Sequence, residues 1–243
     1  MVQASKQMDL KGKIAVITGG NSGIGLAIAT ALAQAGYNLV ISGRRQSKNQ
    51  AVADDLARKF KVQTLAVEAD VSREADCVRL IQDAVAKFGT LHIMVNSAGI
   101  GGGGLVAETK TEDFDRVLKT NLYGTFWCAR AAYPHMKRNQ GDPRGVIINI
   151  SSLAGKQSWS GTGTYSASKF AINGLTQALA DEGKTDHIKA IAICPAMVAT
   201  PMTGVSGPDY LQAEDIAETV LYLLRLSPAA WPTEVVLERR DAS

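Results

Sequence analysis

The sequence predicts an α/β fold in which a doubly wound parallel sheet forms a single domain. Short apolar, β-branched runs alternate with longer amphipathic stretches along all 243 residues. The short runs are almost unbroken in apolar character, as expected for parallel strands that helices cover on both faces. No internal repeat or low-complexity linker divides the chain, and an α/β domain of this length can bury a large core.

The strands are expected, in chain order, at 13–18, 38–42, 62–68, 91–96, 145–151 and 188–194, and the run at 234–238 can add an edge strand. Helices are expected at about 23–36, 46–60, 73–88, 111–138, 164–183 and 212–226. Strand–helix–strand repeats joined by right-handed crossovers give the open sheet of a Rossmann fold. Residues 1–10 are expected to be a tail. Residues 201–211, which contain Gly204 and Gly207, are expected to form a short substrate lid.

The composition argues against several classes of protein. With 46% hydrophobic and 20% charged residues and a net charge of +3 without a basic run, the chain is typical of a globular protein that does not bind nucleic acid. No apolar run reaches the roughly 18 residues that span a bilayer, and the first residues lack a signal-peptide core, so we expect a cytoplasmic protein with no membrane partner. Three widely spaced cysteines and the scattered His92, His135 and His187 predict neither a disulfide framework nor a metal site.

A glycine-rich turn joins the first strand to the first helix. Glycines at these positions allow a tight turn and let backbone N–H groups approach a pyrophosphate, while the positive end of the helix faces the phosphates. The alternative, a plain strand-to-helix turn, is disfavoured by the strand before the motif and the helix after it. The residues expected to contact a dinucleotide here are Gly19, Asn21, Ser22, Gly23, Ile24 and Gly25.

The end of the second strand indicates which dinucleotide binds. Proteins that bind NAD usually place an acidic residue there to accept hydrogen bonds from the adenosine ribose. This chain has Arg44 and Arg45 instead, and two guanidinium groups can pair with a 2′-phosphate. We therefore expect NADP(H) to be preferred, with NAD(H) possible. The alternative is that both arginines are solvated loop charges, which applies more to Arg45.

Tyr165 and Lys169 lie four residues apart at the start of a predicted helix and therefore on one face. A phenol with a pKa near 10 is a poor base at neutral pH, and moving the pKa towards 7 requires about 4 kcal/mol. A unit charge about 5 Å away at an effective dielectric near 20 supplies about 3 kcal/mol. An oxidised nicotinamide could add the rest. Taken alone, such a pair more often forms a solvated helix face.

Ser152 follows the fifth strand, at the edge where open α/β sheets bind ligands. Together with TGxxxGxG, an NNAG-like segment, an Asn and YxxxK in the same order and spacing, it makes nearly the whole chain resemble the short-chain dehydrogenase/reductase family. This resemblance implies that Tyr165 is the general acid/base and that Lys169 makes its proton mobile and binds the nicotinamide ribose. It implies that Ser152 polarises the substrate oxygen. Asn121 would hold a water that links Lys169 to solvent, although an Asn inside a helix can also mark only a local bend.

The resemblance also assigns cofactor contacts beyond the glycine-rich turn. The sequence departs from the family pattern at two positions. Ser97 replaces the second Asn of NNAG, and Ala196 replaces a glycine that follows Pro195. If position 196 requires a positive φ, the alanine would be strained there by about 1 kcal/mol or more. Besides Tyr165 and Lys169, the residues implied are Asp70, Val71, Asn96, Ala98, Gly99, Pro195, Val198 and Thr200.

These features predict an NADP(H)-dependent oxidoreductase that moves a hydride between nicotinamide and a carbonyl or secondary alcohol, as a carbonyl reductase does. One alternative is a 3-ketoacyl reductase that acts on acyl carrier or CoA thioesters. Another is a dinucleotide-binding protein without catalysis, which would not need the proton-handling residues. Trp159 and Met202 are expected near the substrate, although Trp159 can equally pack on the outer surface. The resemblance further implies a homo-oligomer, a tetramer or a dimer.

Overall fold

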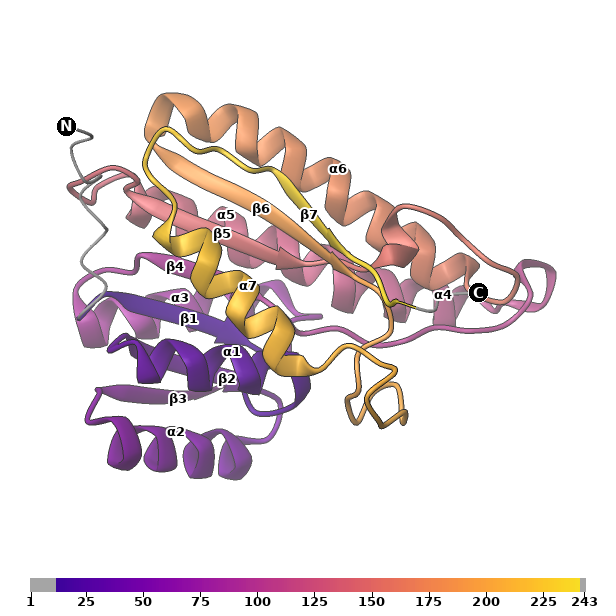
Figure 1. The fold of residues 1–243 in the computed structure, drawn as a ribbon, viewed down its shortest axis with the longest axis horizontal. Coiled ribbons are helices and arrows are strands. Elements are labelled where there is room, and N and C mark those ends of the chain that lie inside the picture. The colour runs from indigo at the N-terminus through magenta and orange to yellow at the C-terminus, as the bar shows by residue number, and fades with distance from the viewer. Residues whose placement is uncertain (1–11, 241–243) are drawn as a thin grey trace.

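The computed structural model describes residues 12–240, so the tail expected at 1–10 lies outside the described residues. Seven parallel strands form one sheet in the order β3-β2-β1-β4-β5-β6-β7 (Figure 1). The order reverses between β1 and β4, and ligands of such sheets bind beyond the carboxyl ends of the strands at this point. The strands are β1 (Ile14–Thr18), β2 (Asn38–Gly43), β3 (Thr64–Glu68), β4 (Ile93–Asn96), β5 (Gly145–Ile150), β6 (Ile188–Pro195) and β7 (Glu234–Leu237).

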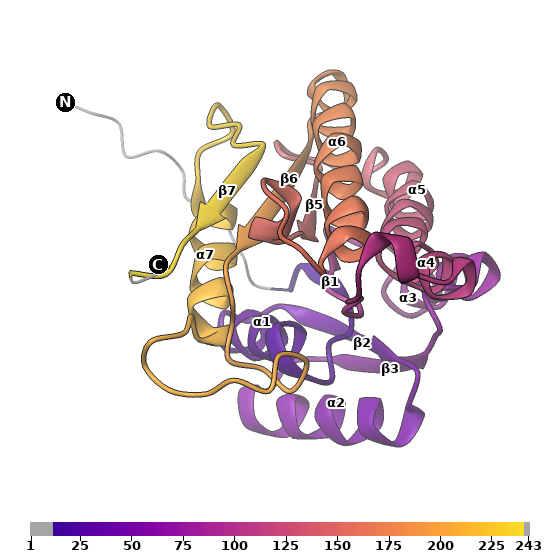
Figure 2. The ribbon, with the colours of Figure 1, turned by 90° about the vertical axis from the view of Figure 1, so that its right-hand side faces the viewer.

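Helices cover both faces of the sheet and give two hydrophobic cores. One core joins the sheet to α1, α2 and α7, and the other joins it to α3, α5 and α6 (Figures 1 and 2). The α-helices are α1 (Gly23–Gln34), α2 (Gln46–Phe60), α3 (Glu74–Phe88), α4 (Thr111–Leu118), α5 (Gly124–Met136), α6 (Gly163–Asp186) and α7 (Ala213–Arg225). Three short helical turns are η1 (Val106–Glu108), η2 (Lys119–Tyr123) and η3 (Leu153–Gly155).

The predicted fold class is confirmed, including the edge strand at the carboxyl end. Every residue of β5 and β6 is buried, which explains why their sequences do not alternate between apolar and polar residues. The three cysteines are buried and free. Among residues 12–240, no helix is long and apolar enough to cross a membrane.

Two details differ from expectation. The helix expected at 111–138 is interrupted by η2, a wider π-helical turn that separates α4 from α5. The buried Asn121 lies in this turn, and its side chain binds the backbone of Ile100, so a tertiary contact accompanies the local widening. The strain considered for Ala196 does not arise, because the residues other than glycine that have positive φ in the described chain are Lys61 and His187.

The loss of stability at acid pH can be tested at His92, which lies just before β4. Its Nδ1 accepts a hydrogen bond from Ile14 N–H over 3.2 Å, and burial lowers the pKa of His92 from 6.5 to about 4. Because the folded-state pKa lies below the unfolded-state value, this stabilisation is complete above pH 6.5 and is lost as the pH falls towards 4. With a discount for partial exposure, the loss at pH 4 is about 2 kcal/mol.

In the His92→Asn variant, a group that does not titrate can accept the same hydrogen bond. Urea unfolding at pH 7 and near pH 4 should therefore show a smaller acid-induced loss of unfolding free energy for this variant than for the wild type. Equal losses in both proteins would show that His92 is not responsible.

Candidate active site

The glycine-rich turn between β1 and α1 is shaped by contacts that leave no room for side chains. Gly19 has φ +67°, and a Cβ at this residue would lie 3.1 Å from the Ala98 Cα. A Cβ at Gly25 would lie 2.3 Å from the Gly19 carbonyl oxygen. Within residues 12–240, the Ser22 side chain makes no capping hydrogen bond to α1. The first N–H groups of α1 therefore remain available to an anion such as a pyrophosphate.

Segments far apart in the sequence meet at this turn. The Thr18 hydroxyl accepts hydrogen bonds from Ser97 N–H and Ala98 N–H, each over 3.2 Å. A Cβ at Gly23 would lie 3.5 Å from the Thr200 side chain. The structure thus brings together three of the predicted cofactor segments. Thr18 was not among the predicted site residues, yet it joins the glycine-rich turn to the segment at Ser97 and Ala98. Its position as the first residue of TGxxxGxG could have identified it.

Two residues expected to contact the cofactor use their side chains within the protein. Asn96 Nδ2 donates to Asn149 Oδ1 over 2.9 Å, across neighbouring strands β4 and β5. The Asp70 carboxylate accepts hydrogen bonds from the backbone N–H of Ser72 over 3.0 Å and from its hydroxyl over 2.8 Å. Both side chains lie at the carboxyl edge of the sheet, and the expected cofactor contacts of Asp70, Val71 and Asn96 stay predictions.

Lys169 and Tyr165 form the centre of the predicted catalytic group. Lys169 is 5% exposed, its Nζ donates to the Ile150 carbonyl over 2.8 Å, and the same Nζ lies 5.5 Å from the centroid of the Tyr165 ring. Ser152 follows β5, and its hydroxyl accepts a hydrogen bond from Ala154 N–H over 3.1 Å. A buried positive charge beside a phenol stabilises negative charge on the phenol oxygen, which acid/base chemistry requires.

The side chains of Asn121 and Lys169 both lie close to Gly99. A Cβ at Gly99 would lie 3.2 Å from Asn121 Oδ1 and 3.9 Å from Lys169 Nζ. Asn121 Nδ2 donates to the Ile100 carbonyl over 3.0 Å and to the Ser168 hydroxyl over 3.1 Å. The Ser168 hydroxyl donates in turn to the Tyr165 carbonyl over 2.6 Å. Ser168 therefore connects η2 with the first turn of α6, a role that sequence reasoning missed.

Arg44 and Arg45 follow β2 and are exposed. Within residues 12–240, neither guanidinium group takes part in an ion pair. Two cations without a carboxylate partner are suited to a dianionic phosphate.

The segment 201–211 connects β6 to α7 as an irregular loop beside α1 (Figure 2). Ala199 N–H donates to the Leu211 carbonyl over 2.8 Å and so closes the base of the loop. Gly204 and Gly207 have positive φ, and a Cβ at either would meet no atom within 4 Å. The Arg239 guanidinium lies 5.1 Å from the Tyr210 ring centroid, which places the end of the described chain against this loop.

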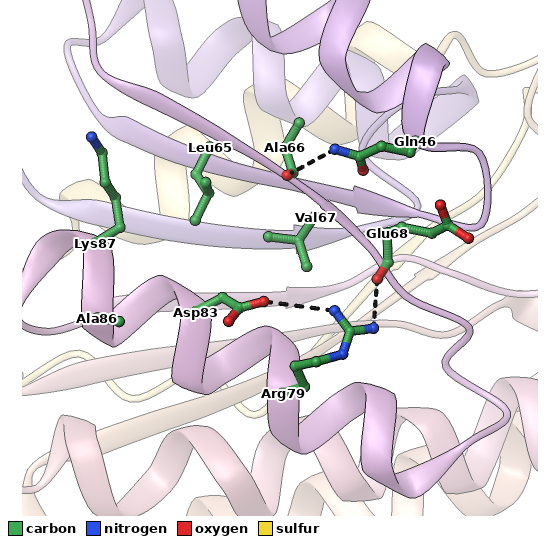
Figure 3. A pocket seen from close by; sticks show the side chains of 9 residues that line it. All are labelled: Gln46, Leu65, Ala66, Val67, Glu68, Arg79, Asp83, Ala86 and Lys87. Carbon is green, nitrogen blue, oxygen red and sulfur yellow. Dashed lines mark hydrogen bonds and ion pairs between the residues drawn. The ribbon is translucent and has the colours of Figure 1, made fainter.

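A hollow of about 600 Å³ forms a groove along β3 between α2 and α3 and is not lined by any predicted catalytic residue (Figure 3). Gln46 Nε2 donates to the Ala66 carbonyl over 3.2 Å and Arg79 donates to the Glu68 carbonyl over 2.8 Å. These side chains occupy carbonyl groups of the edge strand and protect it from pairing with another strand. We therefore interpret the groove as a sealed sheet edge.

A second hollow, about 370 Å³, lies at the first turn of α6, next to Tyr165 in the sequence. Trp159 and Met202 are 49% and 56% exposed. Their expected contact with a substrate stays a prediction. The residues that line this hollow are Val106, Thr109, Thr111, Phe114, Gly163, Thr164 and Ala167.

Known proteins resemble this chain in sequence over most of its length. A family model described as short chain dehydrogenase matches residues 13–210. An uncharacterized oxidoreductase of Staphylococcus aureus is 38% identical over 219 residues, which cover 88% of this chain and 92% of the relative. An uncharacterized oxidoreductase of Staphylococcus epidermidis is 34% identical over 220 residues, with the same two shares.

Solved structures agree in fold over nearly the full chain. An alcohol dehydrogenase from the archaeon Thermococcus sibiricus, in complex with 5-hydroxy-NADP, has a TM-score of 0.87 and 28% identity and covers 93% of this chain and 96% of its own. A dehydrogenase/reductase from Sinorhizobium meliloti has a TM-score of 0.86 and 30% identity and covers 95% and 96%.

Proposed function

The chain belongs to the short-chain dehydrogenase family, and we propose that it is an NADP(H)-dependent oxidoreductase that interconverts a carbonyl and a secondary alcohol. The observation that carries the proposal is the buried Lys169 ammonium group 5.5 Å from the Tyr165 ring. Proton transfer to a substrate needs an acid whose conjugate base is stabilised, and a buried cation beside a phenol meets this need.

The residues of this chain fit a dinucleotide. Gly19 lets the turn pack closely against Ala98, and Gly25 lets the start of α1 pack against Gly19, so that the first N–H groups of the helix lie at the turn, where they favour phosphate. Arg44 and Arg45 would hold the 2′-phosphate of NADP(H). The complex of the Thermococcus sibiricus relative with 5-hydroxy-NADP supports this cofactor.

In the proposed mechanism, the chain's part is to orient the substrate and to move a proton. The bound dinucleotide supplies the hydride at C4 of its nicotinamide ring. Tyr165 donates its phenolic proton to the substrate oxygen, and Lys169 stabilises the negative charge left on the phenol. The Ser152 hydroxyl accepts from Ala154 N–H, so its own proton can be donated to the same substrate oxygen. In the oxidation direction Tyr165 accepts the proton.

The proton on Tyr165 has to be replaced from solvent after each reduction. We propose that Asn121 holds a water that links Lys169 to solvent. Both hydrogens of its amide are already donated, to Ile100 and Ser168, so Asn121 can only accept a hydrogen bond from that water. We also propose that residues 201–211 close over the bound substrate.

Arg44→Ala tests the cofactor preference. Because only NADPH carries the 2′-phosphate, loss of one charge-assisted contact should lower the ratio of kcat/KM for NADPH to that for NADH by about 10–100-fold. Arg45→Ala removes the same charge from the next residue and should have a smaller effect. An unchanged ratio in Arg44→Ala would remove Arg44 from the proposed phosphate site.

A reductase screen tests the activity itself. NADPH oxidation would be followed with ketones, keto esters, aldehydes and acyl thioesters, in parallel with NADH. We expect turnover of a ketone or a keto ester. Turnover of acyl thioesters alone would favour a 3-ketoacyl reductase. Dinucleotide binding without turnover of any class would favour a binding protein.

Exposed aromatic side chains support the proposal of a homo-oligomer, a dimer or a tetramer. We also propose a cytoplasmic location, as expected from the sequence. The molar mass from light scattering should be two or four times the 25.8 kDa of one chain, and a monomer at micromolar concentration would contradict the proposal. These aromatic residues, on α4 to α6, are Phe114, Tyr123, Phe126 and Phe170.

A further inference from the structure

Asn49 is a polar residue on the buried face of α2. It is 0% exposed and shares this face with Ala53 and Leu56, at the spacing of an apolar stripe. An apolar side chain would satisfy the packing there, whereas a buried amide costs free energy unless its hydrogen-bonding groups are paired. Packing of the core therefore does not explain why position 49 carries an asparagine.

The Asn49 amide is paired with three neighbouring segments of the chain. Its Nδ2 donates to the Gly43 carbonyl over 2.8 Å and to the Val67 carbonyl over 3.1 Å, which uses both hydrogens. Its Oδ1 accepts from Asn21 Nδ2 over 2.5 Å. One side chain on α2 thus connects the glycine-rich turn with the carboxyl ends of β2 and β3.

Two of these three contacts, to Asn21 and Gly43, lie at the proposed dinucleotide site. Asn21 belongs to the turn that would hold the pyrophosphate, and Gly43 immediately precedes Arg44. A Cβ at Gly43 would lie 2.7 Å from Asn21 Nδ2 and 3.1 Å from Asn49 Oδ1, so the three residues are packed without spare room.

We propose that Asn49 is a positioning residue that fixes Asn21 and the Gly43–Arg44 backbone in the geometry that binds NADP(H). This inference rests on the proposed function and deepens it. A leucine at position 49 would leave the core filled but would release the turn and the start of the arginine pair. Affinity for the dinucleotide would then fall, and it would fall most for the form that carries the 2′-phosphate.

The test compares dissociation constants of NADPH and NADH, measured by nicotinamide fluorescence titration on the full chain. Asn49→Leu is expected to raise the Kd of NADPH about tenfold, the scale of one lost buried hydrogen bond, and that of NADH by only about threefold. Gly43→Ala crowds the amides of Asn21 and Asn49 without changing the sequence of α2 and is expected to shift the two constants in the same way. This second variant keeps the proposal testable if Asn49→Leu does not fold.

A matched control and a mutant cycle separate positioning from general stability. Leu56→Val alters the same buried face of α2 and should lower the thermal midpoint while both Kd values stay within about twofold. Asn21→Ala combined with Asn49→Leu should weaken NADPH binding by less than the product of the two single effects, because the two amides act through one contact.

Unchanged Kd values in Asn49→Leu and Gly43→Ala, or an equal loss in Leu56→Val, would overturn the proposal. If the wild type binds NADPH tightly and the variants bind it with the same Kd, the positioning role of Asn49 is refuted and the proposed function stands. If the wild type binds neither dinucleotide, the proposed function fails and takes this inference with it.

Discussion

Tyr165→Phe is expected to lower kcat by about 10²–10⁴-fold, the usual contribution of a positioned general acid. The variant removes one oxygen and keeps the ring that lies 5.5 Å from Lys169 Nζ. The packing of α6 should therefore persist, and the Kd of NADPH should change by less than about threefold. The measurement is kcat with the best carbonyl substrate from the screen, together with the NADPH titration.

Tyr222→Phe is the matched control for this change. Tyr222 lies on α7 and is 62% exposed, so removal of its hydroxyl should leave kcat and Kd at wild-type values. Near-normal turnover in Tyr165→Phe would contradict the assignment of the proton to Tyr165. A loss of NADPH binding as large as the loss of kcat would instead indicate that the hydroxyl acts on the cofactor.

Gly25→Ala is the second change with a large expected effect. The added Cβ would lie 2.3 Å from the Gly19 carbonyl oxygen and 2.8 Å from the Gly19 carbonyl carbon. Both atoms belong to the backbone, so the glycine-rich turn has to move away from α1. We expect the Kd of NADPH to rise at least about 100-fold and the unfolding free energy to fall by about 1–3 kcal/mol.

Gly174→Ala is the control for adding a methyl group to a helix. Gly174 lies in α6, and a Cβ there would meet no atom within 4 Å. This variant should bind NADPH as the wild type does and gain about 0.5–1 kcal/mol of stability, because alanine favours the helix. Wild-type NADPH affinity in Gly25→Ala would show that the turn does not hold the dinucleotide.

The parts of the fold that sequence reasoning predicted are those governed by local patterns. The apolar runs of β5 and β6 identify buried parallel strands because both faces of these strands are covered. Tyr165 and Lys169 share a helix face because residues four apart always do. Residues at the glycine-rich turn are recognisable because the turn needs glycines wherever it lies.

The features that sequence reasoning missed depend on contacts between segments that are distant in the sequence. The interruption at η2 involves hydrogen bonds between Asn121 and Ile100, and neither residue signals it alone. Asn49 looks like an ordinary polar residue of an exposed helix until Asn21, Gly43 and Val67 surround it. For the same reason the hydrogen bond between Asn96 and Asn149 across two strands was not predicted, while the expected contact of Asn96 with the cofactor stays a prediction.

A crystal structure of the complex with NADPH tests the central claim most directly. We predict that the 2′-phosphate lies on the Arg44 guanidinium and that Lys169 Nζ binds the nicotinamide ribose. The Tyr165 hydroxyl should face the side of the ring where a carbonyl can approach C4. A dinucleotide bound elsewhere, or a Tyr165 hydroxyl directed away from the nicotinamide, would contradict the account.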